Sequence, residues 1–231
     1  MTPILAAWGV HLYTALGAVV GFFALDATSH GNYGLAFVWM AVATFIDATD
    51  GTLARRARVK EVLPGFDGSK LDDIVDYLNY VVVPVVLAYR AGLIPHGAGG
   101  LALGALPLLA SGYGFCQTQA KTADHFFTGF PSYWNIVVFY FFALATPPWF
   151  NTVMLLLFSV MVFVPIRYLY PSRNPVAQRT THVLGVVWAL GVVVLLAQFP
   201  TPSRTLAWLS LYFPIYYFAV SFHVHFRNQA A

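Results

Sequence analysis

The sequence has few charged residues. Of its 231 residues only 9% are charged, whereas a soluble domain carries about 25%. Hydrophobic residues make up 59% of the chain, and its mean hydropathy is +0.69. This composition excludes an ordinary water-soluble enzyme and a disordered module, and it leaves little room for a separate soluble domain. We therefore expect residues 1–231 to form a single membrane-embedded domain.

Cysteine is almost absent, because Cys116 is the only one in the chain. A single cysteine excludes an intrachain disulfide and a metal site built from cysteines. The net charge of +3 is also small, and we expect no nucleic-acid partner.

The chain contains long apolar runs in place of charged residues. A spanning helix needs about 20 mostly apolar residues, so the chain has room for about eight such helices. Aromatic residues make up 17%, which is typical of a protein with two membrane interfaces. The sequence predicts an all-α integral membrane protein, a bundle of about eight transmembrane helices. The predicted segments are Ile4–Leu25, Tyr33–Asp50, Leu71–Tyr89, Ala98–Cys116, Tyr133–Ala145, Trp149–Leu169, His182–Phe199 and Leu206–Phe222.

Basic residues are scarce on one side of this predicted bundle. Eight spans place both termini on one side, together with the loops after the second, fourth and sixth segments. The other side holds only Arg90 and Arg204. Because an excess of basic residues marks the cytoplasmic side, the sequence predicts that both termini are cytoplasmic. The ten basic residues on that side are Arg55, Arg56, Arg58, Lys60, Lys70, Lys121, Arg167, Arg173, Arg179 and Arg227.

Acidic residues are rare outside one stretch, since seven of the nine lie between Asp47 and Asp76. Asp47 and Asp50 end the second apolar segment, and Asp72 and Asp76 open the third. Spacings of three and four residues put both carboxylates of each pair on one helix face. The connection is long enough for the two helices to run antiparallel, so we expect the four carboxylates to meet at one depth.

Four partly buried carboxylates close together need a compensating cation. Oxygen donors with no histidine or cysteine nearby suit a hard divalent ion such as Mg²⁺ or Mn²⁺. Asp73 points about 100° away from Asp72 on an α-helix and is left outside the predicted metal site. The alternative is a solvated acidic collar at the interface, paired with the neighbouring arginines. Two facing pairs favour a functional site, because ionisable residues in membrane segments are rare and mark function.

The same stretch resembles the signature of the CDP-alcohol phosphatidyltransferases, over residues 47–76. Twelve residues separate the signature arginine from the glycine that follows it, a longer gap than most of that family has. This gap resembles the bacterial phosphatidylcholine synthase branch of the family, as do the stretches Arg55–Pro64, His11–Thr14 and Phe127–Asn135. All eight signature residues are present, namely Asp47, Asp50, Gly51, Ala54, Arg55, Gly68, Asp72 and Asp76.

The resemblance implies an enzyme that transfers a phosphatidyl group from CDP-diacylglycerol to an alcohol and releases CMP. The branch implies choline as the alcohol and a multi-pass protein of the bacterial inner membrane, among membrane lipid, with its active site facing the cytoplasm. Homodimers are common among such relatives, so a homodimer is possible. By resemblance, Asp47, Asp50 and Asp72 bind two Mn²⁺ or Mg²⁺ ions, and Asp76 either completes the metal site or takes the alcohol proton.

The resemblance also assigns residues to the nucleotide and pyrophosphate. Gly51 and Gly68 permit close approach of the substrate, because they have no side chain. Arg55 is predicted to reach a phosphate with its planar pair of donors. Ala54 is predicted to make a small-residue contact, and Thr14 lies at a spacing found near the nucleotide in relatives. His11 stands where many relatives have asparagine, and its role is open between a nucleotide contact and an interhelical hydrogen bond.

Choline carries a fixed positive charge on a nitrogen that has no N–H donor. Its recognition should therefore rest on aromatic faces, each worth about 0.5–2 kcal/mol. Tyr80 lies four residues past Asp76 and shares its helix face. Tyr133 and Trp134 open the fifth segment at the depth of the acidic cluster, and we predict that all three aromatic residues hold the trimethylammonium group. The alternatives are core packing for Tyr80 and an interfacial aromatic belt for the other two.

Two other functions remain open at this point. The first is a family member with another acceptor, such as serine, inositol or glycerol phosphate. Anionic acceptors need a cationic pocket, for which Arg167, Arg173 and Arg179 are candidates, although their positions also suit topology. The second is a divalent-cation transporter, which would be expected to show inverted repeats or broken helices near the middle of the bilayer. The acidic residues here sit at one edge instead.

Overall fold

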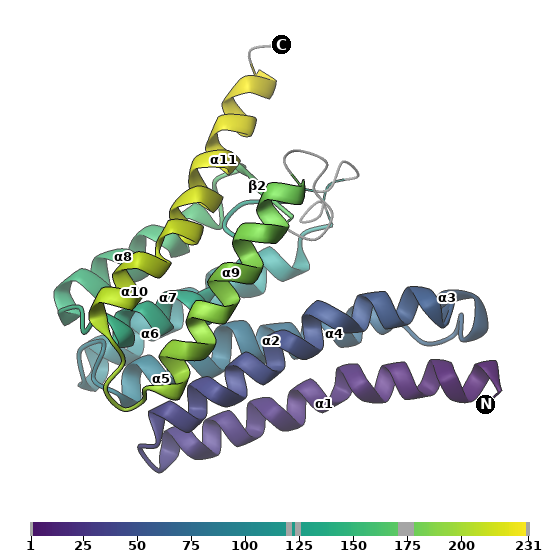
Figure 1. Cartoon of the computed structure of the whole chain (residues 1–231), viewed down its shortest axis with the longest axis horizontal. Helices are drawn as coiled ribbons and strands as arrows, with labels where there is room; N and C mark the ends of the chain where they lie inside the picture. The colour runs from purple at the N-terminus through teal and green to yellow at the C-terminus, as the bar shows by residue number, and fades with distance from the viewer. Residues whose placement is uncertain (1, 119–121, 123–125, 171–177, 230–231) are drawn as a thin grey trace.

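The structure of the protein, a computed structural model, covers residues 2–118, 122, 126–170 and 178–229 (Figure 1). Regular structure in these ranges is helical apart from two short strands, which fits the predicted all-α class. The elements are α1 (Pro3–Ser29), α2 (Tyr33–Arg56), α3 (Val59–Val62), α4 (Gly68–Asp76), η1 (Tyr77–Val82), α5 (Val83–Arg90), α6 (Gly97–Cys116), β1 (Phe126–Thr128), α7 (Trp134–Ala143), α8 (Pro148–Met161), β2 (Arg167–Leu169), α9 (Gln178–Ala197), α10 (Arg204–Ser210) and α11 (Tyr212–Gln229).

Helices α1 and α2 lie side by side and antiparallel (Figure 1). A tight turn joins them, in which Gly31 has a φ of 74°, a conformation that glycine adopts without strain. Asn32 then caps α2, because its side-chain oxygen accepts a hydrogen bond from the backbone N–H of Leu35 at 3.2 Å. The tight turn keeps the two helices together along their length, and this pair forms one wall of the acidic site.

The predicted segment Leu71–Tyr89 is a single helical run, α4–η1–α5, that extends from Gly68 to Arg90. Asp67 caps its start by accepting a hydrogen bond from the Lys70 N–H at 3.0 Å. Its middle, η1, is a π-helix. The reason lies in Pro84, which has no N–H to continue the α-helical ladder, and a π-turn absorbs such a break. The π-turn follows directly after Asp76.

The second half of the chain departs from the predicted segments at its prolines. The segment Trp149–Leu169 was predicted to be helical throughout, and this is wrong beyond Met161. The chain turns over residues 162–164, just before Pro165, and Arg167–Leu169 forms β2, which pairs antiparallel with β1. The segment Leu206–Phe222 is divided into α10 and α11, because Pro214 cannot donate a hydrogen bond back to the end of α10.

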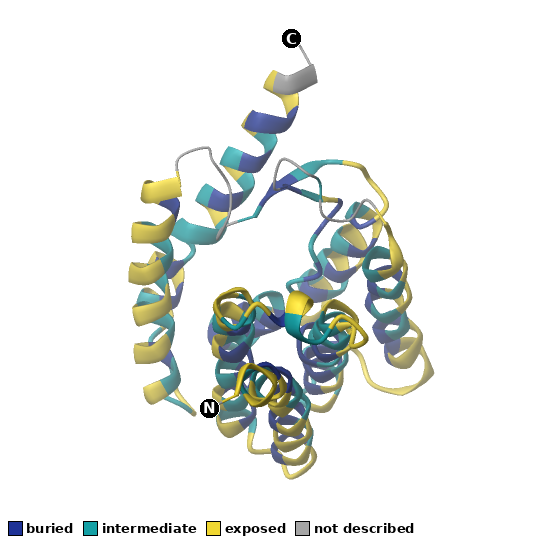
Figure 2. Ribbon diagram, turned by 90° about the vertical axis from the view of Figure 1, so that its right-hand side faces the viewer, coloured by how far each residue is buried: buried dark blue, intermediate teal, exposed yellow. Residues whose placement is uncertain are grey.

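Within the described residues, four helical stretches are long and apolar enough to cross a membrane by length and composition, and α7 and α8 are shorter apolar helices. The long stretches also expose their apolar side chains: on α9, for instance, Val186 and Leu190 are 61% and 62% exposed. Exposed residues follow the outer sides of the helices (Figure 2). Such surfaces are stable in lipid and not in water, so the protein is an integral membrane protein. The four long stretches are Pro3–Ser29, Gly97–Cys116, Gln178–Ala197 and Arg204–Arg227.

Candidate active site

Helix α1 packs closely against the α4–η1 run because it carries two glycines on the contact face. A Cβ atom on Gly17 would lie 2.6 Å from Val75 Cγ1, and a Cβ atom on Gly21 would lie 2.7 Å from Asn79 Oδ1. The buried side-chain amide of Asn79 donates to the Gly17 carbonyl oxygen at 3.0 Å. These contacts hold α4 at a fixed height and rotation against α1, and therefore against α2.

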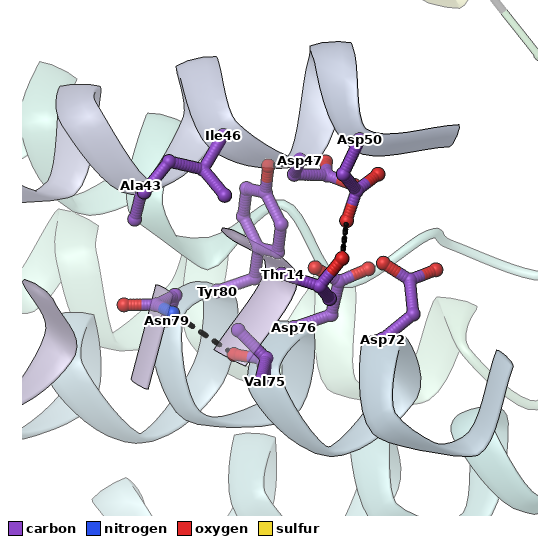
Figure 3. A pocket seen from close by; sticks show the side chains of 10 residues that line it. All are labelled: Thr14, Ala43, Ile46, Asp47, Asp50, Asp72, Val75, Asp76, Asn79 and Tyr80. Atoms are coloured by element: carbon purple, nitrogen blue, oxygen red, sulfur yellow. Dashed lines mark hydrogen bonds between the residues drawn. The ribbon is translucent and has the colours of Figure 1, made fainter. Parts of the chain in front are cut away.

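The four predicted metal-site carboxylates meet in one pocket between α2 and α4 (Figure 3). Asp47 and Asp50 point down from α2, and Asp72 and Asp76 point up from α4. One oxygen from each of Asp47, Asp50 and Asp72 lies within 4.8 Å of the others. Asp76 lines the same pocket but is not part of this closest group. The prediction that the Asp47–Asp50 pair and the Asp72–Asp76 pair face each other is therefore confirmed.

The pocket fits a divalent cation. Oxygen ligands of Mg²⁺ lie about 2.0–2.1 Å from the ion, so opposite ligands are about 4 Å apart, close to the spread of the three carboxylates. Asp50 is only 7% exposed. The ten residues that line this pocket in the described structure include no lysine, arginine or histidine. The group of Asp47, Asp50 and Asp72 can therefore hold a metal ion.

Hydroxyl groups orient two of the carboxylates. Thr14 Oγ1 donates to Asp50 Oδ2 at 2.8 Å in a buried hydrogen bond. The Tyr80 hydroxyl donates to Asp47 Oδ2 at 2.6 Å. Thr14 was predicted to lie near the nucleotide, and the structure places it against a metal-site carboxylate. Thr14 lies in α1 and Tyr80 in η1, whereas both carboxylates lie in α2. The rotation of each carboxylate therefore depends on how α1, α2 and η1 pack together.

The residues predicted for the nucleotide lie along the same ends of α2 and α4. Gly51 and Ala54 are half-buried on α2, directly after Asp50. Arg55 is exposed, and its guanidinium donates to Thr52 Oγ1 at 2.9 Å. It is also the nearest group to a Cβ atom placed on Gly51, at 3.4 Å. The guanidinium thus lies beside the glycine, as its predicted role requires.

Gly68, the signature glycine of α4, lies under the ring of His11. A Cβ atom on Gly68 would come within 2.7 Å of His11 Cε1. His11 is 5% exposed and packs against the rings of Trp8 and Phe66, with centroids 5.8 and 4.3 Å away. Its Nε2 atom has no hydrogen-bond partner among the described residues. Of the two roles left open for His11, an interhelical hydrogen bond through Nε2 is not present there.

Of the three predicted choline residues, Tyr80 lines the acidic pocket. Tyr133 does not line it, but its ring meets that of Tyr80 edge to face at 6.3 Å. Trp134 is fully buried, its Nε1–H donates to Ser111 Oγ at 2.8 Å, and it does not line the pocket. Tyr217 of α11, whose ring lies 6.1 Å from that of Tyr133, was not predicted from the sequence. Nothing in the local pattern connects α11 to the acidic stretch.

Of the basic residues considered for anionic acceptors, Arg167 and Arg179 are described by the structure and do not line the acidic pocket. Arg167 in β2 is half-buried, and its guanidinium carbon lies 5.0 Å from the centre of the Phe126 ring. Arg179 is exposed at the start of α9. Arg173 and Lys121 lie outside the described residues.

The fold and the site define the class, an integral membrane protein with a group of carboxylates between two helices that can hold a metal ion. No family model matches the chain. It is 42% identical over 225 residues to a phosphatidylcholine synthase of Legionella pneumophila, across 94% of this chain and 88% of that protein. It is 37% identical over 202 residues to a phosphatidylcholine synthase of Pseudomonas aeruginosa, across 87% and 84% of the two chains. A third of that name, from Rhizobium meliloti, is 34% identical over 197 residues, across 85% of this chain and 81% of that one. The chain belongs to the phosphatidylcholine synthase family, which confirms the branch that its signature resembles.

Proposed function

We propose that this protein is a phosphatidylcholine synthase, a transferase of phospholipid biosynthesis that uses CDP-diacylglycerol and choline. The observation that carries the proposal is identity to phosphatidylcholine synthases over most of the chain, together with the meeting of the signature carboxylates in one pocket. An acceptor other than choline is not favoured. A transporter is disfavoured because the relatives are named as enzymes.

The transfer reaction forms one bond to phosphorus and breaks another. The choline hydroxyl oxygen must form a bond to the phosphorus of the phosphatidyl group, while the bond from that phosphorus to the oxygen of CMP breaks. Bound divalent ions neutralise the pyrophosphate and stabilise charge on the attacking and leaving oxygens. Asp47, Asp50 and Asp72 would hold them, and Asp76 would either complete the metal site or take the hydroxyl proton. We propose two ions, Mn²⁺ or Mg²⁺, as the resemblance implies.

The nucleotide part of the substrate lies over the signature residues beyond the acidic pocket. Gly51 and Gly68 leave room for it, Ala54 makes a small contact, and Arg55 pairs with a phosphate. The exposure of Arg55 supports this role, because its guanidinium is free to move from Thr52 onto a substrate group. Thr14 acts through Asp50, to which it is bonded.

The choline ammonium lies two carbons from the attacking hydroxyl, so it must sit close to Asp76. Tyr80 lines the pocket together with Asp76, and the ring of Tyr133 contacts that of Tyr80, which supports their predicted part in binding the cation. The role of Trp134 stays a prediction. Its complete burial and its hydrogen bond to Ser111 mean that it acts on choline only by shaping the wall behind Tyr133.

We further propose a single catalytic domain of eight spans in the bacterial inner membrane, with the termini and the active site on the cytoplasmic side. Two contacts support this arrangement. At one end of the bundle, Tyr33 donates to the Arg90 carbonyl oxygen at 2.8 Å, which ties the α1–α2 turn to the end of α5. At the other end, Trp8 near the N-terminus contacts Phe66 of the α3–α4 connection. The acidic pocket lies on α2 and α4 toward that second, basic end.

Release of CMP from CDP-diacylglycerol by the purified protein tests the function. The assay is run with Mn²⁺ or Mg²⁺ against choline, serine, inositol and glycerol phosphate. Phosphatidylcholine formation with choline alone is the expected result. A preference for another alcohol would overturn the choline assignment and keep the transferase, whereas no CMP release with any alcohol would overturn both.

A further inference from the structure

A row of polar side chains connects α7 to the metal-site carboxylate of Asp47. The Asn135 side-chain amide on α7 donates to Thr44 Oγ1 on α2 at 3.3 Å. The Thr44 hydroxyl donates to the Met40 carbonyl oxygen at 3.0 Å and lies within interaction range of the Tyr80 hydroxyl on η1. Tyr80 donates to Asp47 Oδ2 at 2.6 Å. Polar side chains of α7, α2 and η1 therefore lie next to one another beside Asp47, and Tyr80 bonds its carboxylate.

We propose that Tyr80 is a positioning residue for the metal site, and that Thr44 and Asn135 hold its hydroxyl on Asp47. The proposal rests on the proposed function, since it concerns the metal that serves the same reaction. It gives a use to two polar residues in apolar helices, and Asn135 belongs to the stretch Phe127–Asn135 singled out in the sequence.

The donors and acceptors of this row have a definite direction. Tyr80 has one hydroxyl proton, and the short bond to Asp47 uses it, so the Tyr80 oxygen can only accept from Thr44. The Thr44 proton has two acceptors within reach, the Tyr80 oxygen and the Met40 carbonyl oxygen at 3.0 Å. The Asn135 amide supplies the Thr44 oxygen with a proton from its other side. In the structure the Thr44 proton goes to the Met40 carbonyl oxygen, and the donor of this row that reaches the Asp47 carboxylate is the Tyr80 hydroxyl.

Burial makes such a row effective. Tyr80 and Asn135 are each only 7% exposed, so water does not compete for their hydrogen bonds. A hydrogen bond to an ionised carboxylate is about twice as strong as one between neutral groups. A free carboxylate can rotate about its last bond, and a fixed donor on Oδ2 limits that rotation. Partners that orient metal ligands in this way are typically worth about 10–100-fold in metal affinity or activity.

The substitution Tyr80→Phe separates this role from choline binding. It keeps the aromatic ring that choline would contact and removes only the hydroxyl. Mn²⁺ binding to the purified full chain, measured without either substrate by the electron paramagnetic resonance signal of free Mn²⁺, is expected to weaken about 10-fold or more. The Mn²⁺ concentration that gives half-maximal CMP release should rise by a similar factor, with the choline KM measured at saturating Mn²⁺ unchanged.

The chain offers a matched control for this tyrosine. The Tyr13 hydroxyl bonds Thr49 Oγ1 at 2.8 Å, a tyrosine–threonine contact to α2 that does not involve a carboxylate of the pocket. Tyr13→Phe and Thr49→Val should leave Mn²⁺ binding as in the wild type. Thr44→Val should weaken it in the same direction as Tyr80→Phe but less, and it serves as the second variant if Tyr80→Phe does not fold.

Wild-type Mn²⁺ affinity in both Tyr80→Phe and Thr44→Val would overturn the proposal. So would a loss in Tyr80→Phe that appears only in the choline KM, because the hydroxyl would then act on the acceptor. An equal loss in Tyr13→Phe would also overturn it, since the effect would be general packing. Because the binding measurement needs no substrate, it decides this proposal even if the wild-type protein does not use choline.

Discussion

The substitution Gly17→Ala tests whether the packing of α1 on α4 sets the geometry of the acidic pocket. The new Cβ atom would lie 2.6 Å from Val75 Cγ1, whereas carbon atoms in contact are about 3.5–4.0 Å apart. The Val75 side chain or helix α4 itself must therefore shift by about 1 Å, and Val75 lies between Asp72 and Asp76 on that helix. Overpacking of this kind costs about 1–3 kcal/mol. We expect CMP release to fall about 5- to 30-fold if 1–2 kcal/mol of this cost falls on the active arrangement.

The assay compares the rate of CMP release and the thermal unfolding of the protein in detergent for a set of alanine variants. Gly9→Ala on the same helix is the matched control, because no atom lies within 4 Å of its new Cβ. Val75→Ala removes the atom that Gly17→Ala meets, so the double variant should be nearly as active as Val75→Ala alone. A Gly17→Ala variant with wild-type activity, or a double variant no better than Gly17→Ala, would refute the packing argument.

Three further predictions concern the site. Asp73→Asn should reduce activity far less than alanine at the four pocket carboxylates, and full turnover in chelator with the metal verified absent would contradict a metal-dependent reaction. Arg55→Lys should impair CMP release more than Arg56→Lys, because lysine keeps the charge and loses the two-pronged donor geometry; equal effects would leave Arg55 a topology signal. Trp134→Leu should raise the choline KM several-fold and leave that for CDP-diacylglycerol nearly unchanged, and equal loss toward both would indicate a folding role. The four carboxylates that should abolish activity as alanine are Asp47, Asp50, Asp72 and Asp76.

The sequence by itself was enough to predict the membrane class, the family and the four acidic residues of the pocket. Composition determines the class, because a chain with 9% charged residues cannot cover itself with a water-compatible surface. Helix spacing places Asp47 and Asp50 on one helix face, and Asp72 and Asp76 on one face of the other helix, because the backbone determines the period of an α-helix. These are local properties, and local patterns carry them.

Only the tertiary structure decided what surrounds those carboxylates. The break of the sixth segment just before Pro165 and the π-turn after Asp76 follow from prolines, yet whether a proline ends, bends or re-registers a helix depends on what packs against it. The hydroxyls on Asp47 and Asp50 come from Tyr80 and Thr14, residues far from them in the chain. The close approach of α1, α2 and η1 determines these hydrogen-bond partners. Contacts between separate elements produce no periodic pattern in a single sequence, so the sequence alone does not predict them.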